Sequence, residues 1–238
     1  MTLAAAEPRP PALNLRAQAY ENFELQIAQA HIRPGQFVSQ RELMQLLCMP
    51  LGAVRELIPR LEAEGLLRTV PQRGLQIAHV DLKLINNAFQ LRLLLEREAA
   101  VHFTASVSDT DLAAIEDAHL RIVRRARSGS IDDALLIDAT TVDWGLHDLM
   151  IDALGNALIS QSYRVNSLRV RLIKLECSLL TPDELLPAME EHLWFIDALK
   201  RRDAPQVAAR LSHHIESAHR RVLGLARPPL PWSMEELT

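Results

Sequence analysis

The sequence predicts a mainly α-helical protein with a small N-terminal domain and a larger C-terminal helical bundle. Its 238 residues are 48% hydrophobic and only 4% aromatic, which is enough apolar material for one or two cores. Ala, Leu, Arg and Glu recur at helical spacing along most of the chain, as expected for amphipathic helices. Two β-prone runs interrupt this pattern between residues 66 and 80.

Three helices are predicted before the β-prone runs. Residues 1–13 are rich in Ala and Pro and are expected to form a flexible arm. A first helix follows over about residues 15–31. Ser39, with Glu42 three residues later, predicts a capping box that starts a second helix. The third helix lies in AVRELIPRLEAEGLL, where Gly65 is a stop signal.

The β-prone runs read as a hairpin, because the turn-forming segment Pro71-Gln72-Arg73-Gly74 separates them. Three helices followed by a hairpin predict a winged helix-turn-helix over residues 14–80. Residues 81–228 then show only amphipathic helices, about six in number, which fit an all-α antiparallel bundle. Residues 229–238 remain as a tail. Breaks between the bundle helices are expected near residues 106–110, 128–131, 155–156, 181–182 and 203–205.

Charge and apolar patterning narrow the class of protein. The net charge is −4, but residues up to Ala78 hold eight Arg against seven Glu, so an acidic body carries a near-neutral head. No apolar run approaches the length of a membrane span, and no signal-peptide core begins the chain, so we expect a cytoplasmic protein without membrane contact. Cys48 and Cys177 form no paired motif and are expected to serve packing.

Three segments give the chain a family resemblance. RPGQFVSQRELMQLL, AVRELIPRLEAEGLLRTVPQRGLQI and FQLRLLLEREAA resemble successive signatures of the GntR family of bacterial transcription regulators, in the FadR subfamily with an FCD ligand-binding domain. The resemblance implies a symmetric homodimer that reads a palindromic operator in double-stranded DNA, with the third helix in the major groove. It also implies that Arg41, Arg55 and Gly74 face DNA, and Arg73 is a further candidate.

The third helix departs from the family pattern. Pro50 and Leu51 stand where Ser or Thr and then Arg are common, so one base-contacting arginine is missing. Pro59 lacks the N–H that would bond the carbonyl of Arg55, which predicts a bend or break at a cost of about 3 kcal/mol. Taken singly, an arginine on a short helix is more often an ordinary solvated charge.

Four polar residues fall on apolar helix faces in the C-terminal part. Asp143 and His147 are one turn apart, and His192 and His214 each lie on the apolar stripe of a later helix, whereas His213 lies about 100° away. Buried donors without partners are costly. One divalent cation bound by all four residues would relieve that cost, and zinc, nickel, manganese and iron all suit nitrogen and oxygen ligands. The family resemblance implies the same four ligands.

Other readings stay open. Asp143 with His147 alone would indicate a helix-surface ion pair, and a lone inward histidine is usually hydrogen-bonded in a core. Arg92 either clamps an effector carboxylate, as the resemblance implies, or pairs with Glu96. Asn156 either lies near the effector pocket, again by resemblance, or forms an ordinary helix stop. Arg164, Arg169 and Arg171 are unranked candidates.

We therefore expect a transcriptional repressor, not an enzyme, whose metal-containing bundle senses a small carboxylate metabolite. One alternative is a metal-dependent enzyme, which the sequence disfavours because no additional inward glutamate beside the ligands is evident as a general base. The other is a regulator whose metal is purely structural.

Overall fold

The computed structural model describes residues 12–177, 181–226 and 228. It divides into two compact units between Val80 and Asp81. The predicted fold class, a helix-turn-helix head with a small sheet and an all-helical C-terminal unit, is confirmed. Of the predicted arm, residues 1–11 lie outside the described residues, as does the predicted tail at 229–238. The first helix already begins at Ala12, within the predicted arm.

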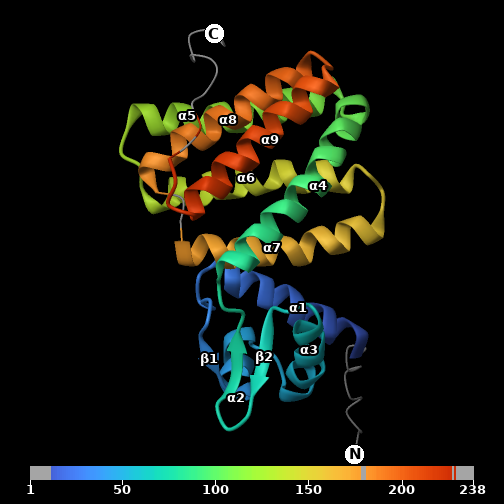
Figure 1. The fold of residues 1–238 in the computed structure, drawn as a ribbon, viewed down its shortest axis with the longest axis vertical. Coiled ribbons are helices and arrows are strands. Elements are labelled where there is room, and N and C mark those ends of the chain that lie inside the picture. Colours follow the sequence, from blue (N-terminus) through green and yellow to red (C-terminus); the bar gives the residue numbers. More distant parts are fainter. Residues whose placement is uncertain (1–11, 178–180, 227, 229–238) are drawn as a thin grey trace, which may run out of the picture. The chain divides into compact units, whose positions relative to one another are not determined.

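The head unit contains three helices, α1 (Ala12–Ala28), α2 (Gln40–Leu47) and α3 (Leu51–Ala63) (Figure 1). The predicted capping box at the start of α2 is present. Glu42 N donates to Ser39 Oγ at 3.1 Å, and Ser39 N donates to Glu42 Oε2 at 2.7 Å. Just after the C-terminal end of α3, Gly65 has a φ of +67°, as expected for a glycine that ends a helix.

The predicted hairpin consists of β2 (Leu67–Val70) and β3 (Gly74–Ile77). A third strand, β1 (Phe37–Val38), was not predicted, because two residues are too few to show an alternating pattern. It pairs with the free edge of β3, so the antiparallel order is β1-β3-β2. A Cβ on Gly74 would lie 2.9 Å from the carbonyl oxygen of Val38, and the residue has a φ of +92°. Packing inside the wing therefore already requires glycine at this position.

Helix α3 passes through Pro59 without a break. The alternative of a broken helix is therefore wrong, and the expected bend near Arg55 to Pro59 stays a prediction. Pro59 is exposed, so water can bond the carbonyl that the proline leaves unpaired, which lowers the cost of an internal proline. Pro50 stands directly before α3 as its N-cap residue, one position earlier than the first helical turn that proline prefers.

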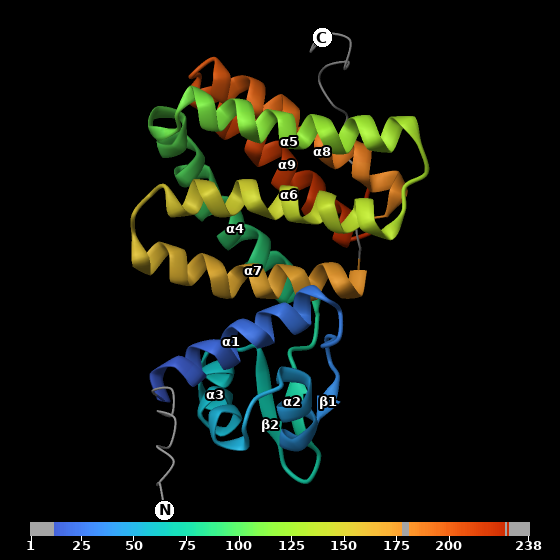
Figure 2. The ribbon, with the colours of Figure 1, turned by 180° about the vertical axis from the view of Figure 1, so that it is seen from behind.

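The C-terminal unit consists of amphipathic helices whose ends fall at the predicted breaks. They are α4 (Leu82–Ser106), α5 (Asp109–Ser128), α6 (Asp133–Asp152), α7 (Ala157–Cys177), α8 (Pro182–Lys200) and α9 (Ala204–Val222). Asp81, Ser108, Asp132 and Asp203 each accept a backbone N–H at the start of a helix. In Figure 2, α4 crosses behind α6 and α7, and it also packs closely on α9.

Both cysteines, Cys48 and Cys177, are exposed, so the expected packing role is wrong; each lies where its helix ends, which hydrophobicity alone does not reveal. None of the described helices is both long and apolar enough to cross a membrane.

Candidate metal centre and nucleic-acid interface

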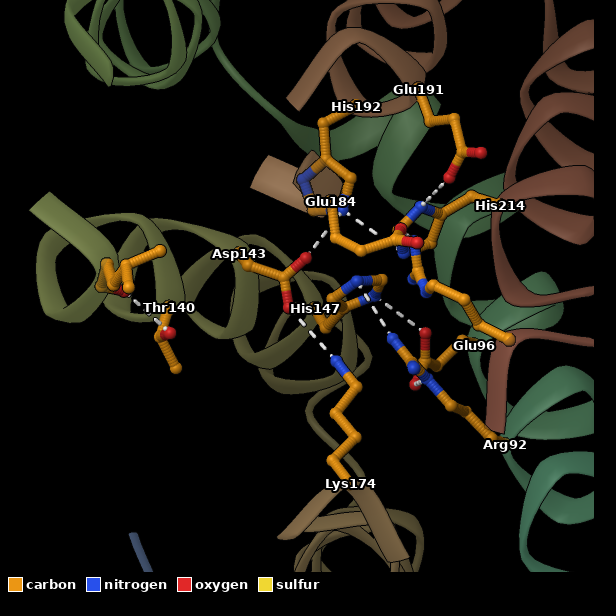
Figure 3. Close-up of polar contacts among 12 residues, drawn as sticks. Arg92, Glu96, Thr140, Asp143, His147, Lys174, Glu184, Glu191, His192 and His214 are labelled. Carbon is orange, nitrogen blue, oxygen red and sulfur yellow. Dashed lines mark hydrogen bonds and ion pairs between the residues drawn. The ribbon is translucent and has the colours of Figure 1, made fainter. Parts of the chain in front are cut away.

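Four buried residues of the C-terminal unit meet at one point. Asp143 and His147 come from α6, His192 from α8 and His214 from α9, and their ligand atoms all lie within 4.8 Å of one another. The close-up shows these side chains pointing toward one another from their three helices (Figure 3). The structure thus brings together the four residues that the sequence predicted as ligands, and it places His214 rather than its neighbour His213 in the cluster.

Each histidine of the cluster has a buried partner on its Nδ1 atom. His214 Nδ1 lies 2.9 Å from Glu191 Oε2, and His147 Nδ1 lies 2.7 Å from Glu96 Oε2. His192 Nδ1 lies 3.0 Å from Nε2 of His119, a residue of α5. Partners of this kind orient metal-binding imidazoles and fix which nitrogen carries the proton.

The inward-facing atoms are hydrogen-bond acceptors that lie close together. His192 Nε2 is 3.2 Å from Asp143 Oδ1 and 3.2 Å from His214 Nε2. Since a carboxylate partner obliges His214 to carry its proton on Nδ1, its Nε2 has a lone pair. Neighbouring ligands about 2.1 Å from one ion lie about 3.0 Å apart around an octahedral ion and about 3.4 Å apart around a tetrahedral one. The donor set and its spacing therefore fit a divalent cation.

Burial and neighbouring charge shape the protonation of the cluster. Burial lowers the pKa of His192 and of His214 well below the usual imidazole value, and the neighbouring imidazoles lower it further. Burial alone would raise the pKa of Asp143, but nearby groups, above all the ammonium group of Lys174, hold it well below its usual value. These shifts favour an ionised Asp143 and neutral His192 and His214, which are the forms that bind metal.

Arg92, on α4, contacts the cluster. Its Nε donates to Glu96 Oε1 at 2.7 Å, and its Nη2 donates to His147 Nε2 at 2.9 Å. Its Nη1 has no hydrogen-bond partner among the described residues, although the side chain is 1% exposed. Burial alone would raise the pKa of Glu96, but Arg92 and His147 outweigh burial and lower it to about 2. The internal pair that the sequence offered as an alternative is thus present, and the Nη1 amino group has no partner among the described residues.

More positive charge lines this side of the bundle. Lys174 Nζ, on α7, lies 3.7 Å from Asp143 Oδ2. Trp144 is nearly buried, and the charged groups of Arg171, Lys174 and Arg92 lie 4.2, 4.9 and 5.4 Å from its ring centroid. Such contacts hold cations over an aromatic face. Positive charge therefore gathers on this side of the cluster, where Arg92 and Lys174 lie beside Glu96 and Asp143.

The remaining effector candidates are placed differently. Asn156 is exposed, and its side-chain oxygen accepts the backbone N–H groups of Leu158 and Ile159 at the start of α7, so it caps that helix. Its predicted effector role stays a prediction. Arg164 pairs with Asp152 at 2.7 Å and also with Asp148. Arg169, like Arg164, is half-buried on α7, and its effector role also stays untested.

The sequence did not predict the contacts that three buried residues make with the proposed ligands. The expectation that no additional inward glutamate lies beside the ligands is wrong, because Glu96 and Glu191 are 0% and 1% exposed and each contacts a ligand histidine. His119, 1% exposed, was not predicted at all. Its signal was available, since it lies on the apolar stripe of α5 with Leu112, Ile122 and Ala126.

The predicted DNA-facing residues lie on the surface of the head unit. Arg41 and Arg55 are exposed on α2 and α3, and Arg55 Nε lies 3.5 Å from Gln40 Oε1. Arg73, also exposed, stands at the tip of the wing with its guanidinium 3.9 Å from the ring centroid of Phe37. All three side chains have access to solvent, which contact with phosphates or base edges requires.

A winged helix-turn-helix head joined to an all-helical unit with a buried Asp and His cluster defines a class of DNA-binding regulator. Residues 15–77 match the gntR family of bacterial regulatory proteins, and residues 87–217, more than half of the chain, match the FCD domain. The chain belongs to the GntR family, in the branch with an FCD domain.

Known proteins agree with this assignment. The HTH-type transcriptional repressor RspR of Escherichia coli K12 is 23% identical over 229 residues, which cover 95% of this chain and 96% of that protein. The solved structure of E. coli McbR/YncC has a TM-score of 0.75 at 16% identity, covering 88% of this chain and 97% of that one. A GntR regulator from Rhodococcus sp. RHA1 has a TM-score of 0.69 at 18% identity, covering 90% and 100%. The solved structures support the fold; the family match makes the chain a DNA-binding transcriptional regulator.

Proposed function

We propose that this regulator is a homodimeric repressor whose C-terminal unit holds a divalent metal ion and senses a small organic acid. The observation that carries the proposal is the convergence of Asp143, His147, His192 and His214 from three helices. Buried partners on the outer nitrogens of the three imidazoles support it. A cluster of acceptors without a cation would be costly in a protein core.

Zinc is the ion that we propose for this cluster. Three imidazole nitrogens and one carboxylate oxygen suit zinc, and nickel, manganese and iron accept the same ligands. When bound, the ion would supply positive charge and an open coordination position for a carboxylate oxygen. Asp143, His147, His192 and His214 would hold it, with Glu96 orienting His147 and Glu191 orienting His214.

Arg92 is the residue that we propose to bind the acid. Its guanidinium is buried beside the cluster, and Nη1 has no hydrogen-bond partner among the described residues. With His147 engaged by an ion, Nη2 would also be available, so the guanidinium could bind a carboxylate with two parallel hydrogen bonds. Lys174 and Arg171 would add positive charge nearby.

DNA binding is proposed to follow the family pattern. In a symmetric dimer, two heads would read the half-sites of a palindromic operator through Arg41, Arg55 and Arg73. The acid alters DNA affinity only if it binds one arrangement of the heads more tightly than the other. Coupling between two such sites is typically about 1–3 kcal/mol, which corresponds to roughly 5- to 150-fold in affinity.

Operator binding measured at full zinc occupancy, with a panel of small mono-, di- and tricarboxylates, tests the proposal. At least one acid should weaken operator binding roughly tenfold, within the usual range of coupling energies. Arg92→Lys, which keeps a positive charge beside Glu96 but cannot form two parallel hydrogen bonds to a carboxylate, should keep its zinc and lose most of the response. If no acid changes the affinity of the zinc-loaded protein, the metal has a structural role. Hydrolysis of small esters faster than by free zinc would instead favour an enzyme.

A further inference from the structure

His119 is a buried residue for which regulation by metal and acid gives no direct role. It lies on α5, contributes no atom to the four-residue cluster and is 1% exposed. A buried imidazole of this kind is most often a core residue satisfied by its own backbone, and His119 Nδ1 indeed lies 2.8 Å from the carbonyl oxygen of Ile115. Its second nitrogen, however, is engaged by a proposed ligand.

The carbonyl oxygen of Ile115 determines which nitrogen atoms of His119 and His192 carry a proton. A carbonyl oxygen only accepts, so His119 Nδ1 must carry a hydrogen that it donates to Ile115 O. In a neutral imidazole the other nitrogen is then an acceptor, and burial opposes a second proton because it would bring a charge into the core. His119 Nε2 therefore accepts from His192 Nδ1, 3.0 Å away.

The same reasoning fixes the inner nitrogen of His192. With its proton on Nδ1, neutral His192 has a lone pair on Nε2, and this atom is the one 3.2 Å from Asp143 Oδ1 and 3.2 Å from His214 Nε2. We infer that His119 is a positioning residue, which holds the proton of His192 on Nδ1 and presents Nε2 unprotonated as the metal ligand. This inference rests on the metal role proposed above.

The three outer partners are not equivalent. Glu96 and Glu191 are carboxylates, whereas His119 is a neutral imidazole. Its own orientation is fixed by a backbone carbonyl one helical turn earlier on α5. The carbonyl fixes the ring of His119, and that ring fixes the proton of His192. Substitution of His119 should therefore act through His192 alone and leave the partners of His147 and His214 in place.

Two variants of the full chain separate this role from simple packing. His119→Phe keeps a ring and removes both nitrogens, whereas His119→Gln keeps an oxygen that can accept from His192 Nδ1. Thr104→Val is the matched control, because it removes another buried side-chain bond to the carbonyl one turn earlier, here Ala100 O, away from the cluster. Zinc affinity is measured by competition with a chromophoric chelator, and the His192 tautomer by nitrogen NMR of the chelator-treated, histidine-labelled protein.

His119→Phe should bind zinc about 10- to 100-fold more weakly than the unsubstituted chain, the usual effect of losing an outer partner. His119→Gln should recover most of that loss, and Thr104→Val should bind zinc normally. In the metal-free protein, the proton of His192 should leave Nδ1 in the Phe variant alone.

Unchanged zinc affinity together with an unchanged His192 tautomer in His119→Phe would overturn the inference. Failure of the proposed function looks different, because the unsubstituted chain would then bind no zinc, or Asp143→Ala would retain it. The tautomer measurement needs no metal, so it tests the positioning role of His119 in either case.

Discussion

The candidate functional residues of the two units differ in burial. In the head, Arg41, Arg55 and Arg73 are exposed and make at most weak contacts. In the bundle, Arg92, Glu96 and the four clustered residues are all at most 6% exposed. A surface charge costs little, so its position alone says little about its role; a buried charge costs several kcal/mol unless it is paired. The position of a buried charged residue in the bundle therefore says more about its role than the position of an exposed arginine in the head does.

Removal of the buried Glu96 carboxylate should give the largest loss in the free energy of unfolding. Glu96→Ala leaves the guanidinium of Arg92 without its partner in the core, and we expect a loss of about 3–5 kcal/mol in the free energy of unfolding. Urea denaturation measures it. Asp117→Ala, which removes an exposed partner of Arg121, should cost under about 1 kcal/mol. Replacement of both members, Arg92→Met with Glu96→Leu, should recover stability; a double variant as unstable as Glu96→Ala contradicts the pairing argument.

The same carboxylate predicts a pH dependence. The pKa of Glu96 is lowered from 4.5 to about 2 in the folded chain. Its contribution to stability is therefore fully present above about pH 4.5 and is lost as the pH falls toward 2. Glu96→Gln should remove this part of the acid sensitivity, measured as the difference in unfolding free energy between pH 5 and pH 3. Equal acid sensitivity in both proteins argues against an ionised Glu96.

Loss of a proposed metal ligand should give the next largest loss of stability. His192→Ala should lower zinc content and thermal stability together, because an ion that binds only the folded chain adds about 2.7 kcal/mol at a hundredfold excess over its Kd. Elemental analysis and thermal melts with and without zinc measure both. His213→Ala is the control, since His213 packs against Trp194 outside the cluster. Undiminished zinc in His192→Ala removes it from the ligand set.

In the head, the wing offers a smaller test. Gly74→Ala places a Cβ against the Val38 carbonyl at a φ of +92°, and we expect a loss of about 1–3 kcal/mol. Gly52→Ala is the control, because nothing lies within 4 Å of its Cβ position on α3; it should stabilise the helix by about 0.5–1 kcal/mol. If Gly74→Ala weakens operator binding without any loss of stability, the glycine serves DNA contact instead of the sheet.

The smallest effect is expected at an exposed arginine. Arg55→Ala should lower the slope of log affinity against log salt by about 0.9 if Arg55 contacts one phosphate. Fluorescence anisotropy with operator DNA between 50 and 200 mM salt measures the slope, over which that contact accounts for roughly a threefold change in affinity. Arg68, on β2, pairs with Gln76, and Arg68→Ala is a control on the same unit. An unchanged slope and affinity remove Arg55 from the interface.

Helical periodicity predicted that the four proposed ligands point inward, because each one occupies a position where a leucine would otherwise pack. Asp143 with His147, His192 and His214 could be found in this way, and His214 could be separated from His213. The outer partners were harder to find. Glu191 follows Glu190 and directly precedes His192, so its position in the sequence does not distinguish it. His119 lies on the apolar stripe of α5, but no second ligand at a typical spacing accompanies it. Strand β1 was not predicted for a similar reason, because two residues are too few to show an alternating pattern.

The sequence by itself determined the helices, their ends, the winged head and the inward direction of the four proposed ligands, because these depend on local periodicity and capping. Only the tertiary structure decided which nitrogen of each imidazole faces the shared point. It also decided that Arg92 pairs with Glu96 while its Nη1 amino group has no partner among the described residues. Such facts depend on residues up to 73 positions apart, as His119 and His192 are. Contacts of that kind arise from helix packing, which no local pattern records.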